Sequence, residues 1–181
     1  METTIFAVKA HVVCAFASFR FAKDYRYHRT YILPPKTTLI GFLGAALGLN
    51  ENELYHEWRG DKPLVDRVSV AVILKSMKGR VRDIWKTVKN KGNEIVKTVI
   101  TREQLYRPEY TIYTTTEDSG LLNDIQGHIN DPVFPLSLGR DDELALVTVV
   151  KQVELTPAKV PVLLHDTILP FDFGQIRTTK L

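Results

Sequence analysis

The chain has 181 residues, of which 44% are hydrophobic and 25% are charged, a composition ordinary for a folded soluble protein with one core. Its single cysteine, Cys14, excludes an internal disulfide and a cysteine-based zinc site, and it favours a reducing compartment. The longest apolar run, residues 39–49, is about half of the roughly 20 residues that a membrane-spanning helix needs, and no secretory signal precedes the first strand pattern. We therefore expect a cytoplasmic protein without a membrane partner.

The net charge of +3 is unevenly distributed along the chain. Residues 1–40 carry six lysines and arginines against two acidic residues, and residues 75–107 carry ten against three. Residues 108–181 carry five against eleven. Two basic segments on an otherwise acidic protein indicate a localised surface for an anionic partner, and the alternative is a solvated charged face.

The first elements are expected to be a strand and a buried helix. Residues 4–21 alternate between apolar and other side chains, which predicts a long strand with one face toward the core. Residues 22–36 are basic and aromatic and end in two prolines, which exclude a helix interior there. From Thr38 to Gly48 the chain is apolar all round, so we expect a buried helix with a hydroxyl cap at its start and a glycine at its end.

Small residues inside this helix are expected to let another backbone come close. They are Gly41, Gly44 and Ala45. A second short helix should follow Asn50, because Glu53 stands three residues later in a capping-box pattern.

The rest of the chain alternates strands with one more helix. Strand patterns cover residues 65–77, 94–101, 110–116, 133–138 and 144–155. A polar, basic stretch at 78–93 with turn signals predicts an extended hairpin that projects from the sheet. Apolar residues at helical spacing predict a short helix over 118–130.

The order strand, helix, strand, strand, helix, strand is the split βαβ arrangement of ferredoxin-like and RRM-like folds, so we expect an α+β protein. We predict one domain at residues 1–155, with the basic hairpin at about 78–101, and an irregular carboxy-terminal tail at residues 156–181. Because many activities use this fold, its function has to be argued from side chains.

The first candidate site is the basic and aromatic stretch that begins at Arg20. Its cations suit phosphates, and its rings suit stacking on unpaired bases. The candidate RNA-binding residues here are Arg20, Lys23, Arg26, Tyr27, His28, Arg29 and Lys36. Thr37 and Thr38 lie at the expected helix start, where hydroxyls and free amides favour an anion. The alternative is a helix cap preceded by a solvated loop.

The second candidate site is the hairpin, where a large aromatic residue stands among cations. Its candidate residues are Lys78, Arg80, Arg82, Trp85, Lys86, Lys89 and Lys91. A projecting hairpin has little core behind it, and stacking Trp85 on a base is worth about 1–3 kcal/mol. The alternative is that Trp85 packs against a partner protein.

Two motifs resemble a known family. The run from Pro34 to Ala45, Pro-Pro-Lys-Thr-Thr-Leu-Ile-Gly-Phe-Leu-Gly-Ala, is similar to the amino-terminal signature of the CRISPR-associated Cas-five family, which belongs to the RAMP superfamily. The earlier pairs at 19–20 and 30–31 fit the same signature. Residues 135–140, Pro-Leu-Ser-Leu-Gly-Arg, resemble the family's later Gly-Arg segment. The resemblance covers most of residues 1–155.

This resemblance implies a ferredoxin-like domain with a protruding thumb hairpin. Members of the family cap the Cascade backbone and bind the repeat-derived 5′ handle of the crRNA. By implication Arg20, Thr37, Thr38, Gly139 and Arg140 line the handle-binding cleft, and the hairpin around Trp85 is the thumb. The implied partners are crRNA, the backbone RAMP subunit and the large subunit of a type I Cascade, with target DNA reached only through the complex.

Enzymatic functions fit the sequence less well. One branch of the family cuts precursor RNA with tyrosine, lysine and histidine, and metal-free cleavage needs a base and a cation at one 2′-hydroxyl. Candidate groups exist, but no Lys-His pair follows the hairpin, and His28 is more simply a stacking or phosphate-contacting residue. The candidates are His11, Tyr27, His28, Tyr31 and Lys36.

Residues 141–143, Asp-Asp-Glu, favour a polar turn over a metal site, so we expect no metal and no cofactor. The leading hypothesis is a non-catalytic crRNA-binding subunit in antiviral defence. The alternatives are a metal-independent endoribonuclease that processes repeat RNA and a protein-interaction module.

Overall fold

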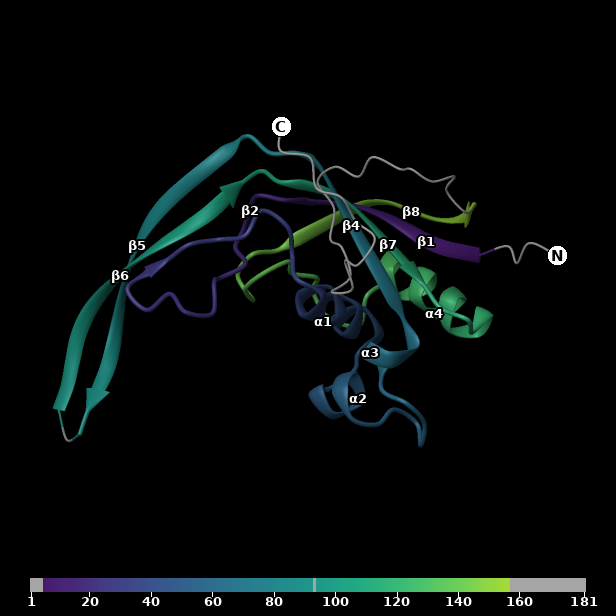
Figure 1. Ribbon diagram of the computed structural model, residues 1–181, viewed down its shortest axis with the longest axis horizontal. Coiled ribbons are helices and arrows are strands. Elements are labelled where there is room, and N and C mark those ends of the chain that lie inside the picture. The colour runs from purple at the N-terminus through teal and green to yellow at the C-terminus, as the bar shows by residue number, and fades with distance from the viewer. Residues whose placement is uncertain (1–4, 93, 157–181) are drawn as a thin grey trace, which may run out of the picture.

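The computed structural model describes residues 5–92 and 94–156, which form a four-stranded sheet, helices on one side of it and a long curved hairpin (Figure 1). The sheet runs in the order β4 (Ser69–Ser76), β7 (Glu109–Thr115), β1 (Ile5–Cys14) and β8 (Ala145–Leu155). All neighbouring strands are antiparallel.

The connections make two interleaved βαβ units. Helix α1 (Lys36–Leu47) connects β1 to β4, and α4 (Ser119–Asn130) connects β7 to β8. Strand β7 lies between the two parallel strands of the first unit, and β1 lies between those of the second. This is the predicted ferredoxin-like α+β arrangement, which the structure confirms.

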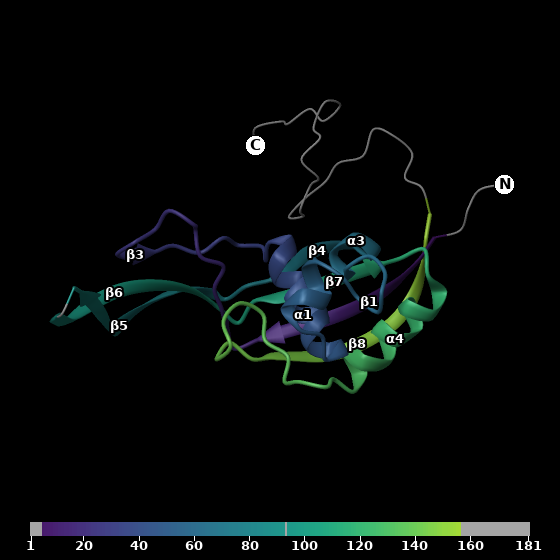
Figure 2. The same cartoon turned by 90° about the horizontal axis from the view of Figure 1, so that it is seen from below.

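Both long helices cover the same face of the sheet, and the core lies between them. Seen from below, α1 and α4 stand in front of the strands (Figure 2). The core side of β1 buries Val8, Ala10, Val12 and Cys14, as the period-2 pattern predicted. Burial raises the pKa of the Cys14 thiol to about 12, so this residue packs as a small neutral group.

The ends of α1 differ from the expectation at one side only. Its N-cap is Pro35 in extended conformation, with no side-chain cap, so Thr37 and Thr38 lie inside the first turn. The expected hydroxyl cap is therefore wrong, because a proline needs no hydrogen-bonding side chain to start a helix. At the other end Gly48 takes φ +74° and its N–H donates to the carbonyl of Gly44, the left-handed ending that glycine permits.

Helix α2 (Glu51–Tyr55) begins with the predicted capping box. The Asn50 side chain accepts from the Glu53 N–H at 3.2 Å, and the Glu53 carboxylate accepts from the Asn50 N–H at 2.9 Å. Leu54 of this helix lies against Gly44, where a Cβ would come within 2.6 Å of its Cδ2. The close approach at Gly44 is thus made by a side chain and not by a backbone.

Two predicted strand segments have other conformations. The segment expected to start a strand at residue 65 begins with the short helix α3 (Leu64–Arg67), and β4 follows it. The segment 133–138 is no strand, because its backbone N–H groups at Val133 and Phe134 donate to the carbonyls of Ala46 and Ala45. The last carbonyls of a helix have no partner within it, and here they bind the passing chain.

The hairpin extends well beyond the main sheet. Strands β5 (Gly79–Lys91) and β6 (Glu94–Tyr106) have 13 residues each and arch away from the body at the left of Figure 1. They are longer than the predicted 78–101. Beside β6 lie two short strands, β2 (Phe16–Ala17), antiparallel to it, and β3 (Tyr27–His28), parallel to it.

The first predicted strand is therefore two strands, because the chain leaves the main sheet after Cys14 and joins the hairpin at Phe16. Among the described residues no helix is both long and apolar enough to cross a membrane. The predicted tail lies outside the described residues, except for Leu155, the last residue of β8, and Thr156.

Candidate nucleic-acid interface

The hairpin has two faces with different side chains. Direct pairing of Trp85 with Ile100 and of Asp83 with Arg102 places these four residues on one face, which we call the tryptophan face. His28 pairs with Arg102 across β3 and β6 and shares that face. Strand alternation therefore brings residues from two distant stretches of the sequence together.

Trp85 lies against two arginines from different segments. The Arg102 Cζ is 4.1 Å from its ring centroid, and the Arg140 Cζ is 4.7 Å from it. Guanidinium groups at this distance are attracted by the ring electrons. Trp85 is half-buried, so the expectation that it has nothing to pack against in its own chain is wrong. The hairpin and the Gly-Arg loop meet at this indole.

His28 connects this pair of arginines to Arg20. Its ring is only 7% exposed, and burial, followed by the positive charges of Arg20 and Arg140, lowers its pKa. The imidazole is therefore neutral at neutral pH. A buried ring offers no face to a base, so the stacking role expected of His28 is wrong. We call Arg20, His28, Trp85, Arg102 and Arg140 the arginine–tryptophan cluster.

Glu143 supports the cluster from beneath. It is 3% exposed and accepts hydrogen bonds from the Ser18 N–H and hydroxyl at 2.7 Å each, from Gln104 Nε2 at 3.0 Å and from the Arg140 N–H at 3.0 Å. Its Oε1 lies 3.8 Å from a guanidinium nitrogen of Arg102. The expected polar turn at 141–143 is therefore only partly correct, because its third residue is a buried anchor.

Gly139 allows the loop to reach this anchor. It takes φ +126°, and a Cβ there would lie 2.8 Å from the Ser18 carbonyl oxygen and would also clash with the Glu143 carboxylate. Only glycine fits both the conformation and the space. The Gly-Arg pair thus has a physical reason, since glycine lets the loop close on Glu143 and the next residue then projects toward Trp85.

The cations of the cluster differ in how they are neutralised. Arg102 is 4% exposed and lies 3.5 Å from Asp83 and 4.0 Å from Asp142. Within the described residues, neither Arg20 nor Arg140 has a carboxylate within 4.0 Å. Their positive charges are therefore available to an anionic ligand.

Three buried donors and acceptors of the cluster have no hydrogen-bond partner in the described part of the chain. They are the Nδ1 of His28 and the Nε and one terminal nitrogen of Arg102. A buried polar group without a partner costs about 1–3 kcal/mol. Such a group is uncommon in a finished core and is typical of a site that is completed by a ligand or by local rearrangement.

Other predicted cations are paired inside the chain. Arg29 donates to Asp24 at 2.9 Å and lies over the Phe21 ring, and Arg80 lies 3.3 Å from Glu103. Arg82 stands over the ring of Tyr27, whose hydroxyl donates to Glu103 at 3.2 Å. These groups form a structural network on the face opposite the tryptophan face, and none of their printed contacts reaches the cluster.

The remaining predicted residues are spread over several places. Lys23 and Arg26 are exposed in the loop before β3, Lys86 is exposed on the opposite face of the hairpin, and Lys78 lies at the hairpin base. The backbones of Lys89 and Lys91 continue β5, but their side chains lie outside the described residues.

The start of α1 is not joined to the cluster by any contact of the described residues. The Lys36 Nζ donates to the Val65 carbonyl at 3.4 Å, and the Thr37 carbonyl accepts from the Tyr55 hydroxyl at 3.5 Å. The amide of Thr38 donates to the Pro35 carbonyl at 3.0 Å. The expected phosphate site at Thr37 and Thr38 thus remains a prediction, and the amide of Thr38 is already used.

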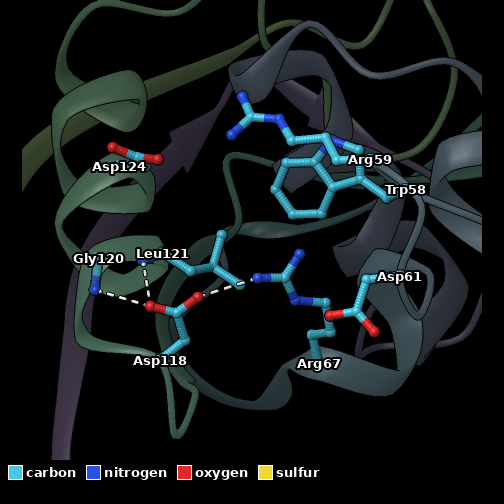
Figure 3. Close-up of a pocket in the computed structure, with 8 residues that line it drawn as sticks. All are labelled: Trp58, Arg59, Asp61, Arg67, Asp118, Gly120, Leu121 and Asp124. Carbon is cyan, nitrogen blue, oxygen red and sulfur yellow. Dashed lines mark hydrogen bonds and ion pairs between the residues drawn. The ribbon is translucent and has the colours of Figure 1, made fainter.

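A separate hollow of about 340 Å³ lies between α3 and the start of α4. In Figure 3 the guanidinium groups of Arg59 and Arg67 flank the indole of Trp58. Arg67 donates to Asp118 at 2.9 Å, and Asp118 also caps α4. These contacts tie α3 to α4, and none of these residues belongs to the arginine–tryptophan cluster. Within the described ranges no group of three histidine, cysteine or acidic side chains could hold a metal ion.

The fold defines a class of protein, a ferredoxin-like domain that carries a long basic β-hairpin. Residues 7–169 match the family described as CRISPR-associated protein (Cas_Cas5). The chain therefore belongs to this family, as the two motifs at Pro34–Ala45 and Pro135–Arg140 predicted.

Solved structures agree with the fold. A chain of a "CRISPR RNA-guided surveillance complex" superposes with a TM-score of 0.59 at 17% identity, over 76% of this chain and 59% of that one. A chain described as "Crystal structure of Cas protein" gives 0.50 at 19% identity, over 76% and 58%.

A chain from the "Cryo-EM structure of the Type III-B Cmr-beta bound to cognate target RNA" gives a TM-score of 0.54 at 11% identity, over 83% of this chain and 61% of that one. At these identities the likeness shows the fold alone. The chain spans about three fifths of the length of these solved chains. No curated protein matches it.

Proposed function

We propose that this protein is a non-catalytic RNA-binding subunit of a type I CRISPR effector complex of the Cascade kind, and that it grips the 5′ handle of the crRNA. The observation that carries the proposal is the convergence of Arg20, Trp85 and Arg140 from three separate segments. Two arginines without an acidic partner suit phosphates, and a half-exposed indole suits an unstacked base.

The family and the structural neighbours support this role. The motif residues Gly139 and Arg140 lie in the cluster itself, with a stereochemical reason for the glycine. The neighbours include chains of an RNA-guided complex and of a complex bound to target RNA. By the same reasoning the partners are crRNA, a backbone RAMP subunit and a large subunit in the cytoplasm, with target DNA bound only through the complex.

An endoribonuclease is the second candidate function, and the geometry supports it less well. Metal-free cleavage needs its acid, base and cation around one ribose. The Tyr27 hydroxyl donates to Glu103, the His28 ring is buried on the other face of the sheet, and the Lys36 Nζ donates to the Val65 carbonyl. The three candidate groups therefore do not converge on one substrate atom.

Incubation of the purified protein with repeat RNA in EDTA tests the proposal against this alternative. We expect the RNA to be retained on a filter and to stay intact, because the protein binds phosphates and bases without a converged catalytic group. The measurement is a denaturing gel of the same samples. A discrete cleavage product that disappears in a Tyr27→Phe or Lys36→Ala variant would establish the enzyme instead.

A further inference from the structure

The outer part of the hairpin stands alone in the described chain. Beyond the Trp85–Ile100 pair, β5 and β6 pair only with each other, and the short strand β3 reaches β6 only at Thr101 and Arg102. In Figure 1 no other labelled element lies beside its end. A two-stranded ribbon is marginally stable by itself in water, so this one needs a partner surface to be held in one shape.

One face of this ribbon is aliphatic and exposed. Ile84 is 69% exposed, Val88 57%, Ile95 74% and Val99 55%. Strand alternation places all four on the face opposite Trp85, and the register makes them diagonal neighbours across the ribbon. We call this the aliphatic face. Four branched apolar side chains exposed together on a projection indicate a surface that another molecule covers.

Two lysines define the charge of this face. Lys86 pairs directly with Val99, and Lys97 pairs directly with Val88, so each cation stands next to an aliphatic side chain. The acidic residue of the described chain on the same face, Glu103, lies nearer the body and is already in contact with Arg80 and Tyr27. The face therefore calls for a partner that supplies both apolar side chains and carboxylates.

Nucleic acid fits this face poorly. Isoleucine and valine have no ring to stack on a base, and burying them against a phosphate backbone would desolvate charge without compensation. The aromatic and guanidinium groups that suit RNA lie on the opposite face, around Trp85 and Arg140. The two faces of the hairpin thus have different chemistry.

We propose that the aliphatic face docks on a neighbouring protein, at an apolar surface edged by aspartate or glutamate, while the tryptophan face holds RNA. The inference rests on the proposed function only in taking that neighbour to be another subunit of the same complex. The hairpin then acts as a partition between a nucleic-acid site and a protein interface, and its two sides can be tested separately.

The test is co-expression of the tagged chain with the other protein subunits of its effector complex, followed by nuclease treatment and affinity purification. In the Ile84→Thr/Val88→Thr/Val99→Thr variant, which keeps the branched shape of each residue, we expect the retained subunit to fall at least about tenfold. Affinity for handle RNA should stay within about twofold. Val96→Thr, on the tryptophan face, is the matched control and should retain the subunit fully.

A second variant, Lys86→Glu/Lys97→Glu, guards against loss of folding, because it changes charge alone on an exposed surface. It should also reduce retention of the subunit, and a photo-crosslinker at Val88 should label protein while one at Thr87 should not. Unchanged retention in both variants would overturn the proposal, as would an equal loss of RNA affinity. Light scattering that shows a dimer dissolved by the variants would assign the face to a second copy and overturn it too.

Failure of the proposed function has a different signature. If the wild-type protein binds no handle RNA but its subunit retention depends on the aliphatic face, the docking surface stands and the RNA proposal fails.

Discussion

Replacing Arg20 and Arg140 together with alanine is expected to weaken binding of an RNA that carries the 5′ handle by roughly 10²–10⁴-fold. Each substitution removes a charge-assisted contact worth about 1.5–3 kcal/mol, and every 1.4 kcal/mol is about tenfold in affinity. Both guanidinium groups lack an acidic partner among the described residues, so little of this energy is already used within the chain.

Fluorescence anisotropy over a range of salt concentrations measures this effect. Because each phosphate contact on a single strand contributes about 0.7 to the slope of log affinity against log salt, the double variant should lose about 1.4 from that slope. Arg59→Ala is the matched control, since this arginine is exposed in the separate hollow beside Trp58. An affinity for handle RNA equal in the wild type and the double variant would contradict the proposed interface.

The second large effect is expected at Glu143, on stability. Replacement by alanine should lower the free energy of unfolding by about 3–5 kcal/mol, because it leaves the buried Arg102 without its buried carboxylate. It also removes the acceptor of the Ser18 and Arg140 N–H groups. Urea denaturation measures the change.

Two further variants make the Glu143 result specific. Glu143→Gln keeps an oxygen acceptor in the same place and should lose less stability than the alanine variant. Asp141→Ala, two residues away and exposed, should change the free energy of unfolding by less than about 0.5 kcal/mol. If Glu143→Ala unfolds with a free energy equal to that of Asp141→Ala, the carboxylate does not anchor the loop.

The fold could be predicted because its signals are local. The period-2 pattern of β1 and the helical spacing in α4 each depend on neighbours within a few residues, and both elements formed where expected. The segment 133–138 also looks like a strand locally, yet its backbone binds the end of α1. No local pattern reveals that competition, because the partner carbonyls are about ninety residues away.

The site was harder to predict because its most important contacts cross the chain. Arg20, Trp85 and Arg140 could be selected as cations and a ring in suspicious places, and the fold brings them together. Arg102 and Glu143 were missed as site residues. Their side chains look like ordinary polar positions of a strand and a turn until the register pairs Arg102 with both Asp83 and His28. The alternation of polar and apolar residues in β6 was the only available signal.

Sequence reasoning also overestimated the number of free cations. Arg29 and Arg80 stand in basic stretches, but each has an acidic partner on the same or the adjacent strand segment. Charge counts cannot separate a phosphate-binding arginine from one that is already paired, because pairing depends on geometry at about 3 Å.

The most direct test of the RNA interface is ultraviolet cross-linking of the protein to the RNA that co-purifies with it, followed by mass spectrometry of the joined peptides and sequencing of the RNA. We predict adducts at Trp85 and in the peptide that contains Arg140, joined to nucleotides at the 5′ end of the RNA. Adducts confined to the hollow around Trp58, or to the open face of the sheet around His11, would contradict the proposed interface.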